Sequence, residues 1–412
     1  MRAIATLVIA VIFINAVVFP NAQQMLHYAF LVIGAFMALI YRRSVPASVL
    51  ILILASCSVT LLYLIIGAFR GATTESAMQT IIIYIISPML WILVIDLAWQ
   101  LLGTEKVIRG LASLALAGSA SVAVYIYLFL NFGPQSVAFF GSNANVHLED
   151  GYSGIAMHVL GSLIFLCAAF AAEPNATQTR FFGLSVLFSL GLATIASGRT
   201  MAVVGIAIGF LFLAVIAFRQ IQWHLLRWVF VIIPAGLLVA LSLNFILGVD
   251  VAQALGRHLD KMQGGDIERP AQIFALMKGM EDTWFLGAGH GIGVEYIRSD
   301  TFPWRYEAVF VALIYKVGFI GSLIVLFPII FALGVFLNAL TFGTARRYDG
   351  FFGAALVASF AAGFTNPYPE AFAFQWMYIL PTYYFLSVRP INRLSRGVSA
   401  AKDEPFRRNL VD

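Results

Sequence analysis

Three charged residues stand where this otherwise apolar chain turns or re-enters an apolar stretch, and their side chains could carry chemistry. Arg199 lies in the short segment "SGRT", Arg269 precedes a proline in "DIERPAQ", and Glu307 begins the apolar run that follows "PWRY". A guanidinium group binds phosphate through two parallel hydrogen bonds, and a carboxylate can accept a proton as a general base. The sequence therefore offers candidates for an anion site and for a base.

Each candidate also has a purely structural interpretation. Arg199 could extend to the lipid headgroups, because a guanidinium group at the hydrocarbon edge is costly without a partner. Arg269 could pair with Glu268 or Asp266, and Glu307 could simply stabilise the positive end of the helix that it begins. These alternatives stay open at the level of the sequence.

The residues next to the candidates refine both interpretations. Ser197 and Thr200 would add hydroxyl donors beside Arg199, and Pro270 suits the first turn of a helix headed by Arg269. Lys316 lies about two and a half turns beyond Glu307 and on a roughly opposite face, so we expect no direct pair between them.

A glycine-rich segment, "WFLGAGHGIG" at 284–293, interrupts the polar stretch before Glu307. It fails the G-x-G-x-x-G pattern, since Ile292 and Val294 occupy the positions that need glycine, and no P-loop lysine follows. We interpret its glycines as allowing a tight turn against the rest of the protein. His290 within it could be a ligand, a proton carrier or a polar loop residue. No H-E-x-x-H, paired-histidine or cysteine pattern for a metal occurs, and we expect no cofactor.

The elements that position these residues are transmembrane helices. The chain has 412 residues, 61% of them hydrophobic and 11% charged, and its mean hydropathy is +0.91. Such a composition predicts an all-α, polytopic integral membrane protein, because a helix needs roughly 20 apolar residues to cross a bilayer and about twelve such stretches occur. They lie near 3–20, 25–41, 46–68, 77–102, 110–131, 153–172, 181–197, 201–218, 228–248, 308–341, 351–365 and 371–388.

The charges predict the orientation of these helices. Lysine and arginine gather in alternate hairpins and in the tail, which places both termini in the cytoplasm by the positive-inside rule. The expected parts are helices one to nine in 1–248 with an outer loop at 132–152, a large outer loop at 249–306, helices ten to twelve in 307–388, and a cytoplasmic tail at 389–412. The basic charge is explained by these membrane anchors, so we expect no nucleic-acid partner.

The large outer loop is expected to be partly helical. In "RPAQIFALMKGMEDTW" the spacing of Ile273, Phe274, Met277 and Met280 predicts a short helix that lies over the bundle. The first apolar stretch predicts an uncleaved helix, since Pro20-Asn21-Ala22 is a poor cleavage site. Cys57 and Cys167 fall within predicted spans and are interpreted as packing residues.

Taken in order, these motifs resemble the O-antigen ligase and polymerase superfamily, the lipid-linked glycan transferases of bacterial inner membranes. The resemblance covers about 130–345 and rests on "SGRT", the arginine that heads a helix in the outer loop, "WFLGAGHGIG", and "KVGFIG" at 316–321. Ligases of this group carry His-Asn fourteen residues before the last glycine of that final motif, and here Glu307 and Ala308 occupy those positions. That departure favours a polymerase of repeat units over a ligase.

The resemblance implies a fold like that of the GT-C glycosyltransferases, a periplasmic active site, and a metal-independent, inverting transfer. Arg199 and Arg269 would hold the diphosphate of an undecaprenyl-linked glycan donor, and Glu307 would take the proton of the acceptor hydroxyl. Further substrate contacts are assigned to Ser197, Thr200, His290, Arg305, Tyr306, His147 and Glu149. Implied partners are the donor, a glycan or lipid acceptor, membrane lipids, and chain-length regulator and flippase proteins. A flippase or transporter of lipid-linked sugars is the rival from another class.

Overall fold

The structure, a computed structural model, describes a defined set of residues, and all that follows concerns these. They are 2–20, 24–41, 46–133, 135–137, 145–146, 155–156, 161–177, 179–197, 200–219 and 268–389.

Helices make up most of these residues, because backbone groups in lipid must be satisfied within their own segment. In chain order they are α1 (Arg2–Val18), α2 (Gln24–Tyr41), α3 (Ala47–Phe69), α4 (Thr74–Ile81), the π-helical turn η1 (Ile82–Ile86), α5 (Ser87–Phe132), α6 (Gly161–Ala172), η5 (Pro174–Ala176), α7 (Arg180–Ser197), α8 (Thr200–Arg219), α11 (Glu268–Asp282), α12 (Val309–Thr341), α13 (Asp349–Gly363), the 3-10 turns η7 (Tyr368–Glu370) and η8 (Phe372–Phe374), α14 (Trp376–Tyr383) and the π-helical turn η9 (Tyr384–Val388). Two short strands, β1 (Asn145–Val146) and β2 (Ile155–Ala156), pair antiparallel.

Within the described chain, five helices are long and apolar enough to cross a membrane, at 24–41, 49–69, 74–129, 200–218 and 309–341. Shorter apolar helices accompany them at 2–18, 161–172, 181–195 and 349–363. Large apolar side chains on several of them face outward, among them Phe36 on α2, Ile51 on α3 and Ile320 on α12, each more than 60% exposed. Water-soluble proteins rarely expose so many apolar side chains, so the protein is a helical membrane protein.

The boundaries of the predicted spans differ from the structure in three places. Predicted spans 77–102 and 110–131 form one continuous helical run with no loop, broken only at Gly103, which has a non-helical φ of 71°. The helix predicted at 153–172 begins at Gly161, and the one predicted at 371–388 begins at Trp376 after two 3-10 turns. The span at 228–248 lies outside the described residues, so the count of twelve stays a prediction.

Helix α6 lies at the centre of the bundle, and all 12 of its residues are buried. It packs against α8 and α13. A methyl group on Gly205 of α8 would lie 2.8 Å from the carbonyl oxygen of Ile164, and one on Gly209 would lie 2.5 Å from that of Ala168. Small residues thus let α6 and α8 approach closely, as is common between helices in membranes. Cys167 of α6 is buried, as its interpretation as a packing residue predicts.

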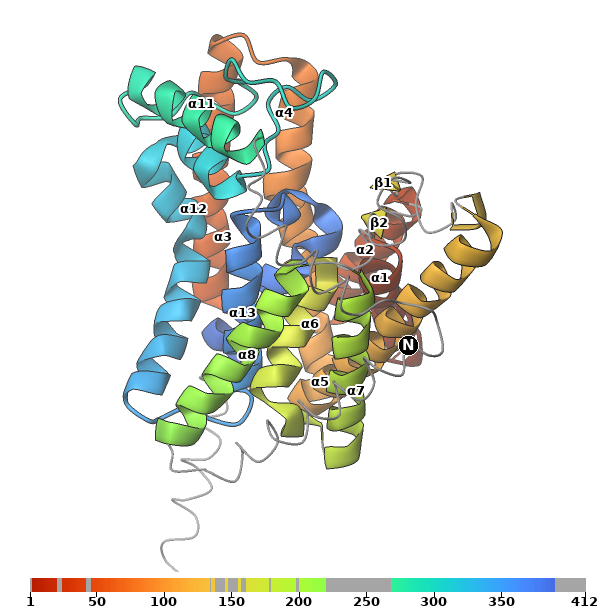
Figure 1. The fold of residues 1–412 in the computed structure, drawn as a ribbon. Helices are drawn as coiled ribbons and strands as arrows, with labels where there is room; N and C mark the ends of the chain where they lie inside the picture. The colour runs from red at the N-terminus through yellow and green to blue at the C-terminus, as the bar shows by residue number, and fades with distance from the viewer. Residues whose placement is uncertain are drawn as a thin grey trace, which may run out of the picture.

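Helix α11 lies across the upper end of the bundle, beside the ends of α3, α4 and α12 (Figure 1). The short helix predicted in the large outer loop is therefore confirmed. Its predicted apolar face is partly wrong, since Phe274 is 74% and Met277 52% exposed. The buried face instead carries Gln272, Leu276 and Met280. The helix is rotated because the buried amide of Gln272 accepts a hydrogen bond from the backbone N–H of Glu307.

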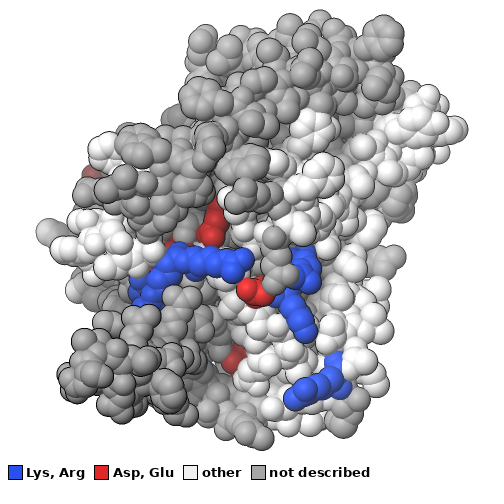
Figure 2. Space-filling view, turned by 90° about the horizontal axis from the view of Figure 1, so that it is seen from below, with Lys and Arg blue, Asp and Glu red and all other residues white. Residues whose placement is uncertain are grey.

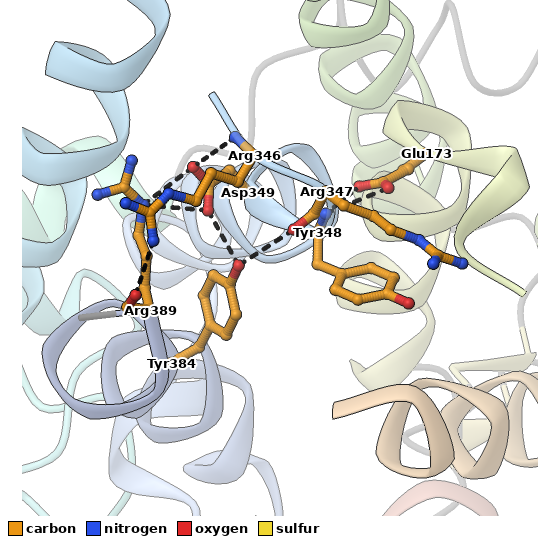
Figure 3. Close-up of polar contacts among 7 residues, drawn as sticks. All are labelled: Glu173, Arg346, Arg347, Tyr348, Asp349, Tyr384 and Arg389. Carbon is orange, nitrogen blue, oxygen red and sulfur yellow. Dashed lines mark hydrogen bonds and ion pairs between the residues drawn. The ribbon is translucent and has the colours of Figure 1, made fainter. Parts of the chain in front are cut away.

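The lower end of the bundle carries a network of charged side chains. Asp349, at the start of α13, is fully buried and accepts hydrogen bonds from the guanidinium group of Arg389 and the hydroxyl of Tyr384 (Figure 3). Glu173 accepts the backbone N–H of Tyr348. Seen from below, lysine and arginine side chains gather in several groups on this face (Figure 2). Basic side chains of the described residues therefore lie on this lower face, and its cytoplasmic orientation stays a prediction of the positive-inside rule.

Candidate functional site

The glycine-rich segment packs between α3 and α12 at the upper end of the bundle. The backbone N–H groups of Ala288 and Gly289 donate to the carbonyl oxygens of Tyr315 and Lys316, at 2.7 and 2.9 Å. The N–H of His290 donates to the carbonyl oxygen of Tyr63 on α3, at 2.9 Å. The backbone of the segment is thus hydrogen-bonded to both helices. These bonds satisfy N–H groups of the loop that would otherwise be buried without a partner.

Gly318 makes this docking possible by breaking α12. Its φ of 70° interrupts the helical hydrogen bonds and leaves carbonyl oxygens of the preceding turn for the glycine-rich segment. A methyl group on Gly318 would lie 2.6 Å from the carbonyl oxygen of Leu286, and one on Gly287, whose φ is 97°, would lie 2.5 Å from the nitrogen of Gly318. The tight turn predicted for these glycines is confirmed, and "GAGHGIG" and "KVGFIG" contact each other directly.

Glu307 is held between two arginines just beyond this segment. The Nε of Arg269 lies 3.0 Å from Oε2 of Glu307, and Nη2 of Arg298 lies 2.7 Å from Oε1. The Glu307 side chain is 19% exposed, while those of Arg269 and Arg298 are 36% and 34% exposed. The carboxylate is therefore ion-paired at both oxygens, at the solvent-facing edge of the upper end.

Two of the three main candidates are thus in direct contact, although they are 38 residues apart in the sequence. Arg269 is in the first turn of α11, followed by Pro270, as predicted. The direct pair was not predicted, and Arg298 was missed. Its only signal in the sequence is that it shares the polar stretch 294–306 with the other candidates.

A second polar cluster lies deeper in the upper part of the bundle. Lys316 of α12 and Glu370 of η7 form an ion pair of 2.8 Å, with side chains 4% and 3% exposed. The hydroxyl of Tyr84 donates to the same oxygen, Oε1 of Glu370. As expected, Lys316 does not pair with Glu307. Sequence reasoning missed Tyr84 and Glu370, because each lies in an otherwise apolar segment far from the other motifs.

His290 borders this cluster and is 2% exposed. Its ring lies 5.1 Å from that of Tyr84, and its two ring nitrogens have no hydrogen-bond partner among the described residues. Burial and the nearby ammonium group of Lys316 lower the pKa of His290 to about 3, although Glu370 opposes the shift. The imidazole is therefore neutral at neutral pH.

The cluster also fixes the charge of Glu370. Burial raises the pKa of its carboxyl. The Lys316 ammonium group, the hydroxyl of Tyr84 and the guanidinium group of Arg305 together lower it by more, so the net shift of this pKa is downward. Arg305 lies with its guanidinium carbon 5.5 Å from the ring centre of Phe302. The charge of Arg305 thus acts on Glu370 in the buried cluster.

The other predicted site residues fall into two groups. Tyr306 is fully buried, and its hydroxyl accepts the backbone N–H of Val294 at 2.7 Å, so in this structure it holds the loop. Thr200 is the first residue of α8, and Ser197 is the last residue of α7. Arg199, His147 and Glu149 lie outside the described residues. Their contacts with substrate, like those assigned to His290 and Tyr306, stay predictions.

An apolar cavity of about 200 Å³ lies below the buried cluster, between α3, α5, α12 and α14. Tyr84 and Pro369 line its upper part, and Leu52, Leu313 and Ile379 line its apolar wall. Cys57, interpreted from the sequence as a packing residue, also lines this cavity. No group of three or more metal-ligating side chains is found in the part of the chain that the structure describes.

Comparison with protein-family models and with curated proteins finds no match to this chain.

Proposed function

We propose that this protein is an inner-membrane glycosyltransferase that polymerises oligosaccharide repeat units carried on a polyprenyl diphosphate, such as undecaprenyl diphosphate. The transfer would occur on the face of the membrane where α11 lies. The observation that supports this most is the contact between Arg269 and Glu307, at 3.0 Å, above an apolar helix bundle. These two residues carry the functions that the transfer needs, a cation for the leaving group and a base for the acceptor.

In this proposal, a hydroxyl oxygen of the acceptor sugar attacks the anomeric carbon of the donor. The bond between that carbon and the diphosphate oxygen breaks, and the configuration at the carbon inverts. The hydroxyl proton passes to the carboxylate of Glu307. The electron pair of the broken bond leaves with the diphosphate. Arg269 would oppose the growing negative charge of this group, and so would Arg199 in the role predicted from the sequence. Fixed guanidinium groups in a partly dehydrated site stabilise such charge strongly.

The apolar cavity between α3, α5, α12 and α14 suits a short segment of the hydrocarbon part of such a donor. Its walls are almost entirely apolar, and it lies directly below the polar cluster of Tyr84 and Glu370. Apolar cavities of this kind stay dry and take up hydrocarbon. A lipid-linked sugar could thus place its chain in the bundle and its diphosphate at the upper end.

Two other functions remain as candidates. A ligase would transfer the glycan to lipid A-core or to another acceptor, but Glu307 occupies the position where such ligases carry histidine. A flippase or transporter is favoured by the buried pair of Lys316 and Glu370, since ionisable side chains inside membrane proteins often mark transport paths.

The test is reconstitution of the purified protein in liposomes with purified lipid-linked repeat units and no lipopolysaccharide acceptor. A ladder of glycan lengths on a gel would support a polymerase. Glu307→Gln and Arg269→Ala should each abolish the ladder. Glu295→Gln is the matched control, because Glu295 also pairs with a cation at this end but is 87% exposed.

Each alternative has its own outcome in the same system. Transfer only after addition of a lipid A-core acceptor would favour a ligase. Movement of labelled lipid-linked sugar between leaflets, without any new glycosidic bond, would favour a transporter. A full ladder from Glu307→Gln would reject the catalytic role of that residue.

A further inference from the structure

The carboxylate of Glu307 is contacted by cations from two separate segments of the chain. Arg269 comes from the start of α11 and Arg298 from the loop before α12, and each contacts a different oxygen of the same carboxylate. Guanidinium groups bind carboxylate and phosphate oxygens through the same kind of charge-assisted hydrogen bond. Two cations from separate segments thus converge on one small anion, an arrangement that also suits a phosphate.

Access to this site does not require the bundle to open. The side chains of Arg269 and Arg298 are 36% and 34% exposed, so both guanidinium groups reach the surface. The Glu307 side chain between them is less exposed, at 19%. A phosphate arriving from outside would therefore meet the guanidinium groups before it met the repelling carboxylate.

Gln272 provides a second, independent observation. Its side chain is fully buried, and its Oε1 accepts the backbone N–H of Glu307 at 3.0 Å. Its Nε2 is buried and has no acceptor among the described residues. Buried donors in proteins almost always have an acceptor, so this amide has a hydrogen to donate to a ligand oxygen that enters beside Glu307. The bond to Oε1 also holds the backbone of Glu307, while the two arginines alone hold its carboxylate in the described residues.

We propose that Glu307 is an internal substitute for the substrate anion, and that a phosphate group binding to Arg269 and Arg298 displaces its carboxylate. The idea rests on the proposed function, in which the ligand is the diphosphate of the donor. Displacement releases the carboxylate from both cations and makes its oxygens available to the acceptor hydroxyl. The base thus becomes competent only when the donor is in place, and donor binding precedes activation of the acceptor.

The probe for this exchange is inorganic pyrophosphate, titrated calorimetrically into the full-length protein in lipid nanodiscs at low salt. Glu307→Gln keeps the size of the side chain and removes the competing charge. It should tighten pyrophosphate binding on the order of tenfold. Arg298→Ala should weaken binding strongly, both in the parent and together with Glu307→Gln. Glu295→Gln should bind as the parent does.

Unchanged or weaker binding by Glu307→Gln would overturn the proposal. If that variant does not fold, Arg298→Ala in the parent decides, since pyrophosphate binding that survives it would place the anion elsewhere. The outcome is separable from that of the proposed function. Tighter binding by Glu307→Gln without any glycan ladder from the parent would reject the polymerase and retain the exchange. Ladders from the parent with unchanged binding by the variant would do the reverse.

Discussion

Lys316 and Glu370 form an ion pair of 2.8 Å in which neither side chain is more than 4% exposed. The pair joins the first part of α12, before the break at Gly318, to the loop between α13 and α14. The backbone carbonyl of the same lysine accepts the N–H of Gly289 in the glycine-rich segment. Removing one partner of such a pair is costly because the other charge stays buried without compensation.

The first prediction concerns this pair. Lys316→Met should lower the free energy of unfolding by about 3–5 kcal/mol, because the Glu370 carboxylate would lose its main cation. Adding Glu370→Gln should restore most of the loss. Tryptophan fluorescence during denaturant unfolding in detergent measures both. The control is Lys278→Met in the exposed pair with Glu295, where about 1 kcal/mol or less is expected. Equal effects at the two positions would contradict a buried, uncompensated charge.

The second prediction concerns His290 and acid. Its pKa is lowered from 6.5 to about 3, chiefly by burial, so the unfolded chain binds a proton in this range and the folded protein does not. Stability from this residue is complete above pH 6.5 and falls as the pH drops towards 3, by about 1.4 kcal/mol per pH unit. His290→Gln should flatten the stability curve between pH 6.5 and 4.5. A curve with unchanged slope would show that the imidazole is accessible to protons.

The third prediction has the opposite sign and concerns Glu173 at the lower end. Burial raises the pKa of its carboxyl from 4.5 to about 7, against the hydrogen bonds from Tyr348 and Phe351. The contribution of Glu173 to the stability of the fold is therefore most favourable below pH 4.5 and is lost as the pH rises through 7. Glu173→Gln should gain on the order of 1–3 kcal/mol relative to the parent at pH 8. It should show no gain at pH 4. Thermal unfolding at both pH values tests this, and a gain independent of pH would contradict it.

The fourth prediction concerns the approach of the glycine-rich segment to α3. A methyl group on Gly67 would lie 2.0 Å from the carbonyl oxygen of His290, which is backbone and cannot move aside. Gly67→Ala should displace the segment and destabilise the protein by more than about 2 kcal/mol. Gly334→Ala on α12 is the control, since nothing lies within 4 Å of its added methyl group. Protease cleavage within 284–293 should increase in the first variant alone.

Parts of the fold could be predicted from the sequence alone. Uniform hydrophobicity predicted α3 and α12 to within a residue or two, because a helix in lipid depends mainly on its own composition. The glycines of "GAGHGIG" were interpreted correctly, since few other structural uses exist for such a run. Arg269 and Glu307 stood out because charges at the edge of apolar stretches are rare; the structure places them in contact, and their role in a site stays a prediction.

The rest depended on tertiary contacts that have no local signal. Glu370 and Tyr84 lie 286 residues apart, so their contact cannot be read from spacing. The face of α11 was misjudged because the polar Gln272 is buried by a hydrogen bond to the backbone of Glu307, while Phe274 is exposed. The spans predicted at 77–102 and 110–131 follow each other without a loop, because the positive φ of the single residue Gly103 suffices to redirect the helix.

The central claim is that Glu307 takes the acceptor proton in a glycan transfer supported by Arg269. The measurement that tests it most directly is the initial rate of ladder formation in liposomes that contain only the purified protein and lipid-linked repeat units. Loss of a general base typically costs about 10²–10⁴-fold in rate, so Glu307→Gln should fall by at least about 100-fold. Glu295→Gln should keep the rate of the parent. A parental protein that forms no ladder, or a Glu307→Gln variant that matches it, would contradict the account.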